Sequence, residues 1–335
     1  MKTKIPPFID PNQNDQFSKL KGLDLQELIT EIENFDFHYR KILNIPEDMT
    51  FGTELEYELA NKNQIDKFIT KNLDEWASKF DISLYKGGEI TSPILTNTEQ
   101  TWEELKSICD LLKEKRAITN QNAGGHIHIG AHTLGTDYKK WKKMFKIYIA
   151  YEHILFRFGF GDKISARKDI LGYAAPIADM LYKSLQEIEE FKNLRDVIYI
   201  IPNREKNQAI NFRNIQSHSL KNKRAKNTLE FRNPNATIEE TIWQNNINAY
   251  AHLLLSTSSK TYDEEFIDYK LQHERVSFET DSYMYHEVCL KNALEFVDLI
   301  FNNNLDKVYF LKQYLKGFQQ SYGTAPAQKA KIFIK

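Results

Sequence analysis

The segment from Phe51 to Leu59 alternates between acidic residues and residues that suit a buried strand face, and this alternation limits the folds open to the chain. Glu54, Glu56 and Glu58 stand at every second position, between apolar or β-branched residues. Because successive side chains of a strand point to opposite faces, the segment predicts a strand with one buried and one acidic face. Three carboxylates on one face repel one another. We therefore expect positive charge to lie opposite them.

Four other short segments place functional groups on one predicted face of a strand. The polar faces carry His126 and His128, Asn211 and Arg213, and Glu230 and Arg232, and Glu89 follows a pair of glycines. Any one of these segments alone is better explained as an ordinary antiparallel strand with its polar face in water. A solvated face of this lysine-rich protein should collect lysine, yet the five segments contain none. Together they favour a functional face.

The spacing of the predicted elements favours an α+β fold with an antiparallel sheet. Several predicted strands lie too close together for helical crossovers, which parallel strands need. Helical periodicity covers residues 23–43, 64–80, 102–115 and 138–158, and most of the chain from 237 to 318. Besides the strands with functional groups, we expect short strands at 82–85, 197–201 and 331–334. Residues up to Gly22 are rich in Pro, Asn and Lys and predict an extended arm.

The charge balance and the absence of long apolar runs exclude several classes of protein. The chain has 45 Lys and Arg residues against 46 Asp and Glu residues, a net charge of -1. We therefore expect no nucleic-acid partner, since such proteins usually carry a basic excess or patch. No apolar run approaches the roughly 18 residues of a membrane helix, and the first residues lack the apolar stretch of a secretory signal. We expect a cytoplasmic protein without a membrane partner.

The residue types on the predicted polar face indicate metal-dependent chemistry with an anionic substrate. Carboxylates and imidazoles without a thiolate suit Mg²⁺ or Mn²⁺ better than a structural zinc ion. Arg213 and Arg232 supply planar donors that match phosphate or carboxylate oxygens. Metal and arginine together indicate phosphoryl transfer. The chain has no GxxxxGK[ST] loop and no convincing GxGxxG motif, so nucleotide binding of the P-loop or Rossmann kind is unsupported.

An ordered series of motifs resembles the amidoligase family, a branch of the superfamily of glutamine synthetase and glutamate-cysteine ligase. The motifs are Glu54-Leu55-Glu56, Gly88-Glu89-Ile90-Thr91-Ser92-Pro93, Gly124-Gly125-His126-Ile127-His128-Ile129-Gly130 and Thr228-Leu229-Glu230-Phe231-Arg232. Each motif alone is weak, whereas four in this order with amphipathic helices between them are fairly specific. The resemblance runs from about Phe51 to about Ala251 and covers roughly two thirds of the chain.

The resemblance implies a glutamine synthetase-like catalytic domain, in which a curved antiparallel sheet forms a funnel covered by helices. It implies that ATP and two or three Mg²⁺ or Mn²⁺ ions bind there. ATP phosphorylates a carboxylate, and an amine then displaces phosphate to form an amide. The carboxylate and amine could belong to an amino acid, a peptide or a protein tail. The implied organisation is an arm and helix at 1–48, the catalytic domain at 49–256 and a mostly helical extension at 257–335.

The resemblance also implies roles for individual residues. The implied metal ligands are Glu54, Glu56, Glu89, His126 and Glu230, with His128 nearer the nucleotide; which of the two histidines binds metal stays open. Arg232 and Arg167 are the implied phosphate or substrate contacts, with Arg213 as a further catalytic candidate and with Asn211 and Ser92 as substrate candidates. The family often has an Asp-Gly-Ser loop before the Glu89 strand, whereas this chain has Asp81-Ile82-Ser83.

Two other functions stay open on the sequence alone. The same Glu and His cluster could serve a metal-dependent phosphoesterase or hydrolase, or the chain could be a non-catalytic binding protein of the same fold. Glu58 lies one step beyond the matched pair and is as typical of a solvated strand end as of a ligand. The N-terminal fifty residues and the helical end from about Thr257 are candidates for contacts with a partner or in a homo-oligomer.

Overall fold

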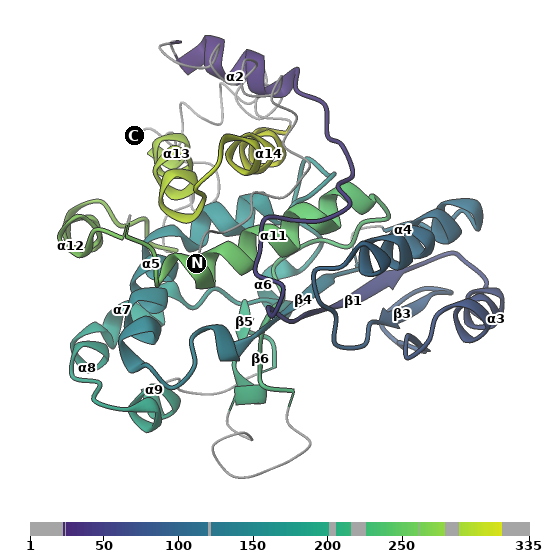
Figure 1. Cartoon of the computed structure of the whole chain (residues 1–335), viewed down its shortest axis with the longest axis horizontal. Helices are drawn as coiled ribbons and strands as arrows, with labels where there is room; N and C mark the ends of the chain where they lie inside the picture. The colour runs from purple at the N-terminus through teal and green to yellow at the C-terminus, as the bar shows by residue number, and fades with distance from the viewer. Residues whose placement is uncertain are drawn as a thin grey trace.

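The computed structural model describes residues 23, 25–119, 122–200, 206–215, 226–260, 262–278 and 288–316. The expected N-terminal arm and the expected strand at 331–334 lie outside these ranges. The described chain combines helices with one six-stranded sheet, in the order β2-β3-β1-β4-β6-β5. Every pair of neighbouring strands is antiparallel, which confirms the predicted sheet type. Figure 1 shows the sheet at one side of the helical layers.

Five of the six strands fall at the segments predicted to carry functional groups on one face, whereas the strand at 77–79 lies within a predicted helix. The strands are β1 (Phe51–Tyr57), β2 (Ala77–Lys79), β3 (Gly88–Thr91), β4 (Gly125–Gly130), β5 (Ile210–Asn211) and β6 (Thr228–Phe231). Leu55 of β1, Ile127 of β4 and Phe231 of β6 are fully buried and belong to one continuous apolar core. The polar residues between them therefore point to the opposite face of the sheet.

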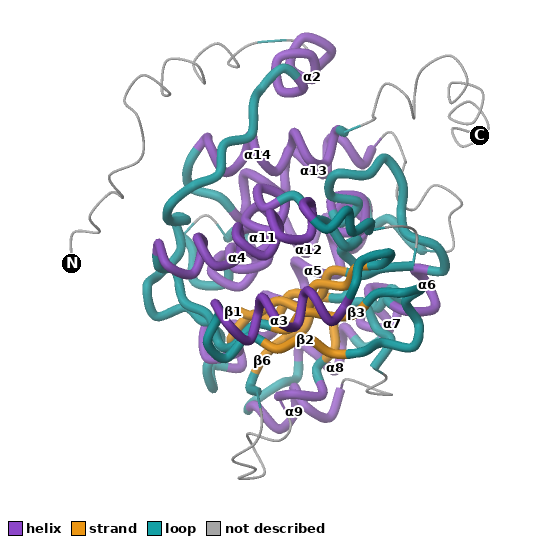
Figure 2. Tube along the Cα trace, turned by 90° about the vertical axis from the view of Figure 1, so that its right-hand side faces the viewer, coloured by secondary structure: helices purple, strands orange, loops and turns teal. Residues whose placement is uncertain are grey.

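The other described elements are helices, several of which share the apolar core with the sheet. They are α2 (Leu25–Glu33), α3 (Lys62–Asn72), α4 (Glu99–Glu114), α5 (Tyr138–Phe158), α6 (Ile170–Tyr173), α7 (Ala178–Lys183), α8 (Leu185–Glu189), α9 (Leu194–Ile200), α11 (Glu240–Ser256), α12 (Glu264–His273), α13 (Val288–Ile300) and α14 (Asn304–Leu315), with a 3₁₀ turn at Ala131–Thr133. The ring of Tyr250 on α11 stacks on Phe231, with ring centroids 4.2 Å apart. Figure 2 shows α11, α13 and α14 on one side of the strands.

Polar caps define where several of these helices begin. The side chain of Thr98 accepts a hydrogen bond from the backbone N–H of Thr101 at the start of α4, and Asp137 caps α5 in the same way through Lys139. Such caps satisfy N–H groups that have no partner within the helix. No helix within the described ranges is both long and apolar enough to cross a membrane.

The chain between α3 and β3 differs from the prediction. The helix expected at 64–80 ends at Asn72, because Leu73 takes an extended conformation and ends the helical hydrogen bonds. Residues 77–79 form β2 instead, and the strand expected at 82–85 is a turn. Asp81 stabilises this turn, since its Oδ1 accepts hydrogen bonds from the backbone N–H and the hydroxyl of Ser83.

Two further strand predictions need correction. Residues 194–200 form helix α9, although the pattern predicts a strand at 197–201, whose last residue is outside the described ranges. A short apolar run fits a buried helix as well as a strand, so its periodicity does not decide between them. The strand predicted to carry Asn211 and Arg213 is limited to Ile210–Asn211, and Arg213 lies in a helical turn beyond it.

Candidate metal and substrate site

The strand register brings the predicted polar residues together in cross-strand rows. Glu56 on β1 lies opposite Glu89 on β3, and Glu54 on β1 lies opposite His126 on β4. On the next strand pairs, His128 lies opposite Glu230 and Glu230 lies opposite Asn211. Because these positions are an even number of residues apart on each strand, their side chains share one face. Five separate segments thus supply one polar surface.

Glu54 stands at the centre of this surface and contacts both imidazoles. Its Oε2 lies 3.0 Å from Nδ1 of His126, and its Oε1 lies 3.0 Å from Nε2 of His128. Burial raises the pKa of the Glu54 carboxyl, but the contacts to the two histidines outweigh burial and hold that pKa well below its usual range. Glu54 is therefore ionised at neutral pH.

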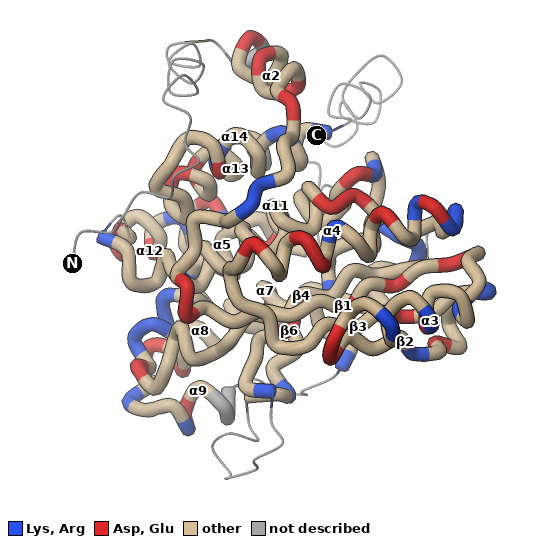
Figure 3. The backbone as a smooth tube through the Cα atoms, turned by 45° about the vertical axis from the view of Figure 1, so that its right-hand side comes forward, with Lys and Arg blue, Asp and Glu red and all other residues tan. Residues whose placement is uncertain are grey.

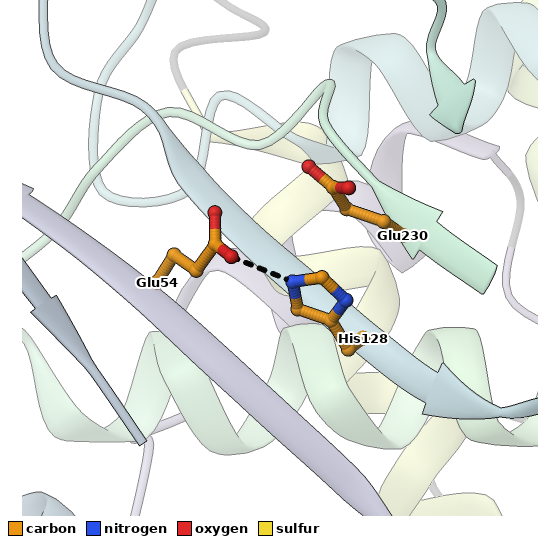
Figure 4. A group of neighbouring side chains, drawn as sticks. All are labelled: Glu54, His128 and Glu230. Carbon is orange, nitrogen blue, oxygen red and sulfur yellow. Dashed lines mark hydrogen bonds and ion pairs between the residues drawn. The ribbon is translucent and has the colours of Figure 1, made fainter. Parts of the chain in front are cut away.

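A first group of potential metal ligands consists of Glu54, His128 and Glu230. One ligand atom from each lies within 4.8 Å of the others. Figure 4 shows the three side chains converging from β1, β4 and β6. The carboxylate of Glu230 is oriented from both sides: Nδ2 of Asn211 donates to its Oε2 over 2.7 Å, and Nη1 of Arg232 donates to its Oε1. Partners of this kind fix a ligand before the metal binds.

A second group of potential ligands consists of Glu56, Asp81 and Glu89, again with one atom of each within 4.8 Å of the others. Oε2 of Glu56 accepts a hydrogen bond from the backbone N–H of Gly124 over 2.5 Å, which fixes this carboxylate against β4. Burial raises the pKa of the Glu89 carboxyl, and the negative charge of Glu54 raises it further. A cation between these groups would relieve that repulsion.

Asp81 is the residue of this second group that the sequence analysis did not select. It lies in the turn between β2 and β3, where neither period-two alternation nor helical spacing gives a signal. The one available signal was its place in Asp81-Ile82-Ser83, the segment that departs from the Asp-Gly-Ser pattern. The Asx turn with Ser83 orients the carboxylate without needing the glycine.

The two buried arginines of the site hold different parts of it. Arg232 contacts Glu230 through Nη1, which also lies 3.4 Å from Nδ1 of His126. Arg167 donates to the backbone carbonyls of Pro234 and Arg232 over 2.5 and 2.8 Å. Burial lowers the pKa of the Arg167 guanidinium to about 10. The guanidinium therefore stays charged at neutral pH, while its described contacts support the backbone that follows β6.

A glycine makes this packing of Arg167 against the site feasible. A Cβ atom on Gly124 would lie 2.7 Å from Nη1 of Arg167 and 3.0 Å from Nε2 of His126. Any side chain at position 124 would therefore displace one of these two groups.

Three other residues considered from the sequence lie differently from the main groups. Arg213 is exposed beyond the end of β5, and its backbone N–H donates to Oδ1 of Asn211. The hydroxyl of Ser92 accepts from the backbone N–H of Thr53 and donates to the carbonyl of Pro93. Glu58 is fully buried, so it is no solvated strand end, and its Oε1 accepts from the backbone N–H of Tyr85. The substrate and catalytic roles of Ser92 and Arg213 stay predictions.

The donor set fits divalent cations such as Mg²⁺ or Mn²⁺. Five carboxylates and one imidazole make up the two groups, which are oxygen-rich and contain no thiolate. Figure 3 shows acidic positions on β1 and β3, and these two strands supply Glu54, Glu56 and Glu89 of the two groups. Protein cations balance part of this charge: Arg232 pairs with Glu230, Nζ of Lys226 lies 3.5 Å from Glu54, and Nζ of Lys79 lies 3.6 Å from Glu89.

The comparisons with known proteins give one family match. A family described as "putative amidoligase enzyme" matches residues 47–254, a range that includes β1 to β6 and every residue of both ligand groups. A search of curated proteins gives no match. The family therefore covers well over half of the chain and the whole of the polar face.

Proposed function

The chain belongs to the amidoligase family, and on this premise we propose that it is an ATP-dependent ligase that joins a carboxylate to an amine. The observation that supports the proposal is the strand register, which brings Glu54, Glu56, Glu89, His128 and Glu230 onto one face of the sheet, where Asp81 joins them from the turn between β2 and β3. Two cation sites beside each other suit a reaction in which a triphosphate and a carboxylate meet. We further propose a glutamine synthetase-like fold for the catalytic unit at 49–256.

In this proposal Glu54, His128 and Glu230 hold one divalent cation, and Glu56, Asp81 and Glu89 hold another. When bound, such cations neutralise phosphate charge and stabilise the charge that develops as phosphate is transferred. His126 contacts Glu54 and lies 3.9 Å from Glu56, so it connects the two groups rather than belonging to either. This assignment differs from the one that the sequence resemblance implied, in which His126 binds metal and His128 lies nearer the nucleotide. The arrangement supports two of the two or three ions expected from the sequence.

The remaining residues position the reactants. Lys226 lies beside the first ligand group, and we propose that it and the guanidinium of Arg232 attract the phosphates of ATP.

The proposed reaction has two steps. An oxygen of the substrate carboxylate attacks the γ-phosphorus, and the bond to the ADP oxygen breaks. The amine then attacks the acyl carbon, phosphate leaves and one amine proton is released. Asn211 and Arg167 act indirectly, by orienting Glu230 and the backbone of Arg232.

A hydroxylamine trap tests this function whatever the natural amine is, because hydroxylamine takes the place of the amine. The full chain is incubated with ATP, Mg²⁺, hydroxylamine and, in turn, each amino acid and a mixture of short peptides as carboxylates. We expect acyl hydroxamate to form together with equal amounts of ADP and phosphate. Release of phosphate from p-nitrophenyl phosphate without ATP, and no hydroxamate with any carboxylate, would instead assign the site to a phosphoesterase.

Metal binding should also stabilise the folded protein. At a Mg²⁺ or Mn²⁺ concentration a hundred times the dissociation constant, one site contributes about 2.7 kcal/mol. For a chain of this length that corresponds to a rise in the midpoint of thermal unfolding of about 4 °C. The rise is measured by calorimetry or by tryptophan fluorescence on protein first stripped with EDTA.

Three variants test which residues are responsible for the metal-dependent rise in the thermal midpoint. His128→Ala should reduce the rise more than His126→Ala, because only His128 lies in a ligand group. Glu114→Gln is the matched control, since its exposed carboxylate at the end of α4 pairs with Lys115 and belongs to neither group. A thermal midpoint that neither ion changes in the unmodified chain would contradict both proposed cation sites.

A further inference from the structure

The turn between β2 and β3 presents an unusual group of exposed apolar side chains. Phe80, Ile82 and Tyr85 are 74%, 92% and 62% exposed. Leu59 and Ile118 beside them are 48% and 39% exposed. We call these five side chains the apolar ledge. Single exposed apolar residues need no explanation, but a group of them marks a binding surface more often than not.

Backbone hydrogen bonds connect the members of the apolar ledge. The backbone N–H of Leu59 donates to the carbonyl of Tyr85 over 3.2 Å. Glu58, the neighbour of Leu59, exchanges two backbone hydrogen bonds of 2.9 Å with Ile118. The ledge thus joins the turn, the end of β1 and the segment after α4. These backbone hydrogen bonds hold the three parts of the chain beside one another.

The turn is fixed to the rest of the fold while its apolar side chains face outward. The side chain of Leu84 is buried against Ala123 and Ala236. The carboxylate of Glu58 accepts the backbone N–H of Tyr85 over 2.7 Å. A Cβ atom on Gly87 would lie 1.8 Å from the carbonyl oxygen of Tyr57, so the turn lies directly against β1. A ligand would therefore meet a preformed surface, which lowers the entropy lost on binding.

The apolar ledge continues directly from the second ligand group. Asp81 lies between Phe80 and Ile82 in sequence, and its carboxylate belongs to the group with Glu56 and Glu89. The basic residue Lys226 lies at the other group, next to Glu54 and before β6. In the sheet order, β3 and β6 lie on opposite sides of β1 and β4. One end of the site therefore suits a polyanion, and the other end suits an apolar group.

Cationic side chains border the apolar ledge. The ammonium group of Lys86 lies 5.3 Å from the centre of the Tyr85 ring. Lys79 is 56% exposed at its side chain and reaches Glu89 of the ligand group. A ligand that carries both an apolar side chain and a carboxylate would complement this border. An extended peptide can reach from Glu89 to the ledge, whereas a small free amino acid over the ligand group would leave the ledge uncovered.

We propose that the apolar ledge binds a bulky apolar side chain of a peptide substrate, whose reacting group lies over Glu56, Asp81 and Glu89. This inference rests on the proposed ligase function and narrows its substrates to peptides or protein tails with Leu, Ile, Phe or Tyr near the reacting group. Lys79 and Lys86 contact a carboxylate of the same peptide.

A random tripeptide library tests the inference in two ways. In the first, the library is incubated with the full chain, ATP, Mg²⁺ and hydroxylamine, and mass spectrometry identifies the peptides converted to hydroxamates. In the second, the protein with Mg²⁺ and a non-hydrolysable ATP analogue is separated from free peptides by gel filtration, and the retained peptides are identified. The second measurement needs no turnover. Both are repeated with Phe80→Ser combined with Ile82→Ser, which changes two exposed residues outside the ligand groups.

The matched control is Phe266→Ser combined with Tyr269→Ser. These two residues are 41% and 54% exposed on α12, which packs on α5 far from β3 in Figure 1. We expect the unmodified chain and the control to prefer peptides with a bulky apolar residue over Gly and Ser peptides by about tenfold or more, the effect of burying one such side chain. The ledge variant should lose this preference and keep its activity on Gly and Ser peptides.

The outcomes separate the two proposals. Hydroxamate formation without an apolar preference in the unmodified chain would overturn the ledge and leave the ligase function standing. Retention of apolar peptides by the unmodified chain and not by the ledge variant, without hydroxamate, would support the ledge and contradict the ligase. Dimerisation that the ledge variant abolishes, without peptide retention, would assign the surface to a second copy of the chain and overturn the inference.

Discussion

Glu54→Gln is expected to lower the rate of ATP-dependent hydroxamate formation by about 10³-fold, the scale set by removing one preorganised charged group from a phosphoryl-transfer site. Glu54 contacts both imidazoles, one through each carboxylate oxygen. Glutamine keeps the length of the side chain, but one of its two polar atoms becomes a donor. It can neither accept from both histidines nor carry the negative charge that a cation needs. The readout is ADP released per enzyme under saturating ATP and Mg²⁺.

The pH dependence and a control make this result specific. Because the pKa of Glu54 lies below its usual range, the carboxylate of the unmodified chain is ionised from mildly acidic pH upward. Glutamine does not titrate, so raising the pH should not restore activity to the variant. Glu230→Gln should behave similarly, since Asn211 and Arg232 hold Glu230 in the same ligand group. Glu114→Gln should keep full activity. Turnover of Glu54→Gln within tenfold of the unmodified chain, with unchanged circular dichroism, would contradict the proposed site.

The sequence predicts the candidate site best where functional residue types stand at alternate positions of a strand. The alternation in β1 and in β4 identified Glu54, Glu56, His126 and His128 and assigned them to one face, because a strand repeats every two residues. The sequence does not indicate which residues of neighbouring strands lie opposite one another. The sequence could not show that His128 lies opposite Glu230, or that Gly52 lies opposite His128 and lets Glu54 reach it diagonally.

The sequence also does not predict the role of residues in turns. Asp81 belongs to a ligand group only because the turn after β2 folds back over the end of β1, a tertiary arrangement fixed by Leu84 and Gly87. The pattern at 197–201 predicts a strand although residues 194–200 are helical, because a short apolar run that is buried, as at Val197, fits either element. In both places long-range packing determines the local structure.

Long-range packing also joins the chain before β1 to the C-terminal helices. Nη1 of Arg40 lies 2.6 Å from Oδ1 of Asp306, whose side chain is fully buried at the start of α14. Burial raises the pKa of the Asp306 carboxyl, yet Arg40 and His252 hold it below its ordinary value. A folded-state pKa below the unfolded value of about 3.9 means that this stabilisation is complete above that pH and is lost as the pH falls further.

Asp306→Ala is expected to lower the free energy of unfolding at pH 7 by about 3–5 kcal/mol, because it leaves the guanidinium of Arg40 buried without its carboxylate. Urea unfolding followed by tryptophan fluorescence measures the loss. The matched control is Asp298→Ala, whose carboxylate is 70% exposed beside Lys307 and should contribute less than about 1 kcal/mol. Replacing both members of the pair, with Arg40→Met and Asp306→Leu, should cost less than Asp306→Ala alone, because no charge is then left unpaired. Equal losses for Asp306→Ala and Asp298→Ala would show that the buried pair does not stabilise the contact between α14 and the segment that leads into β1.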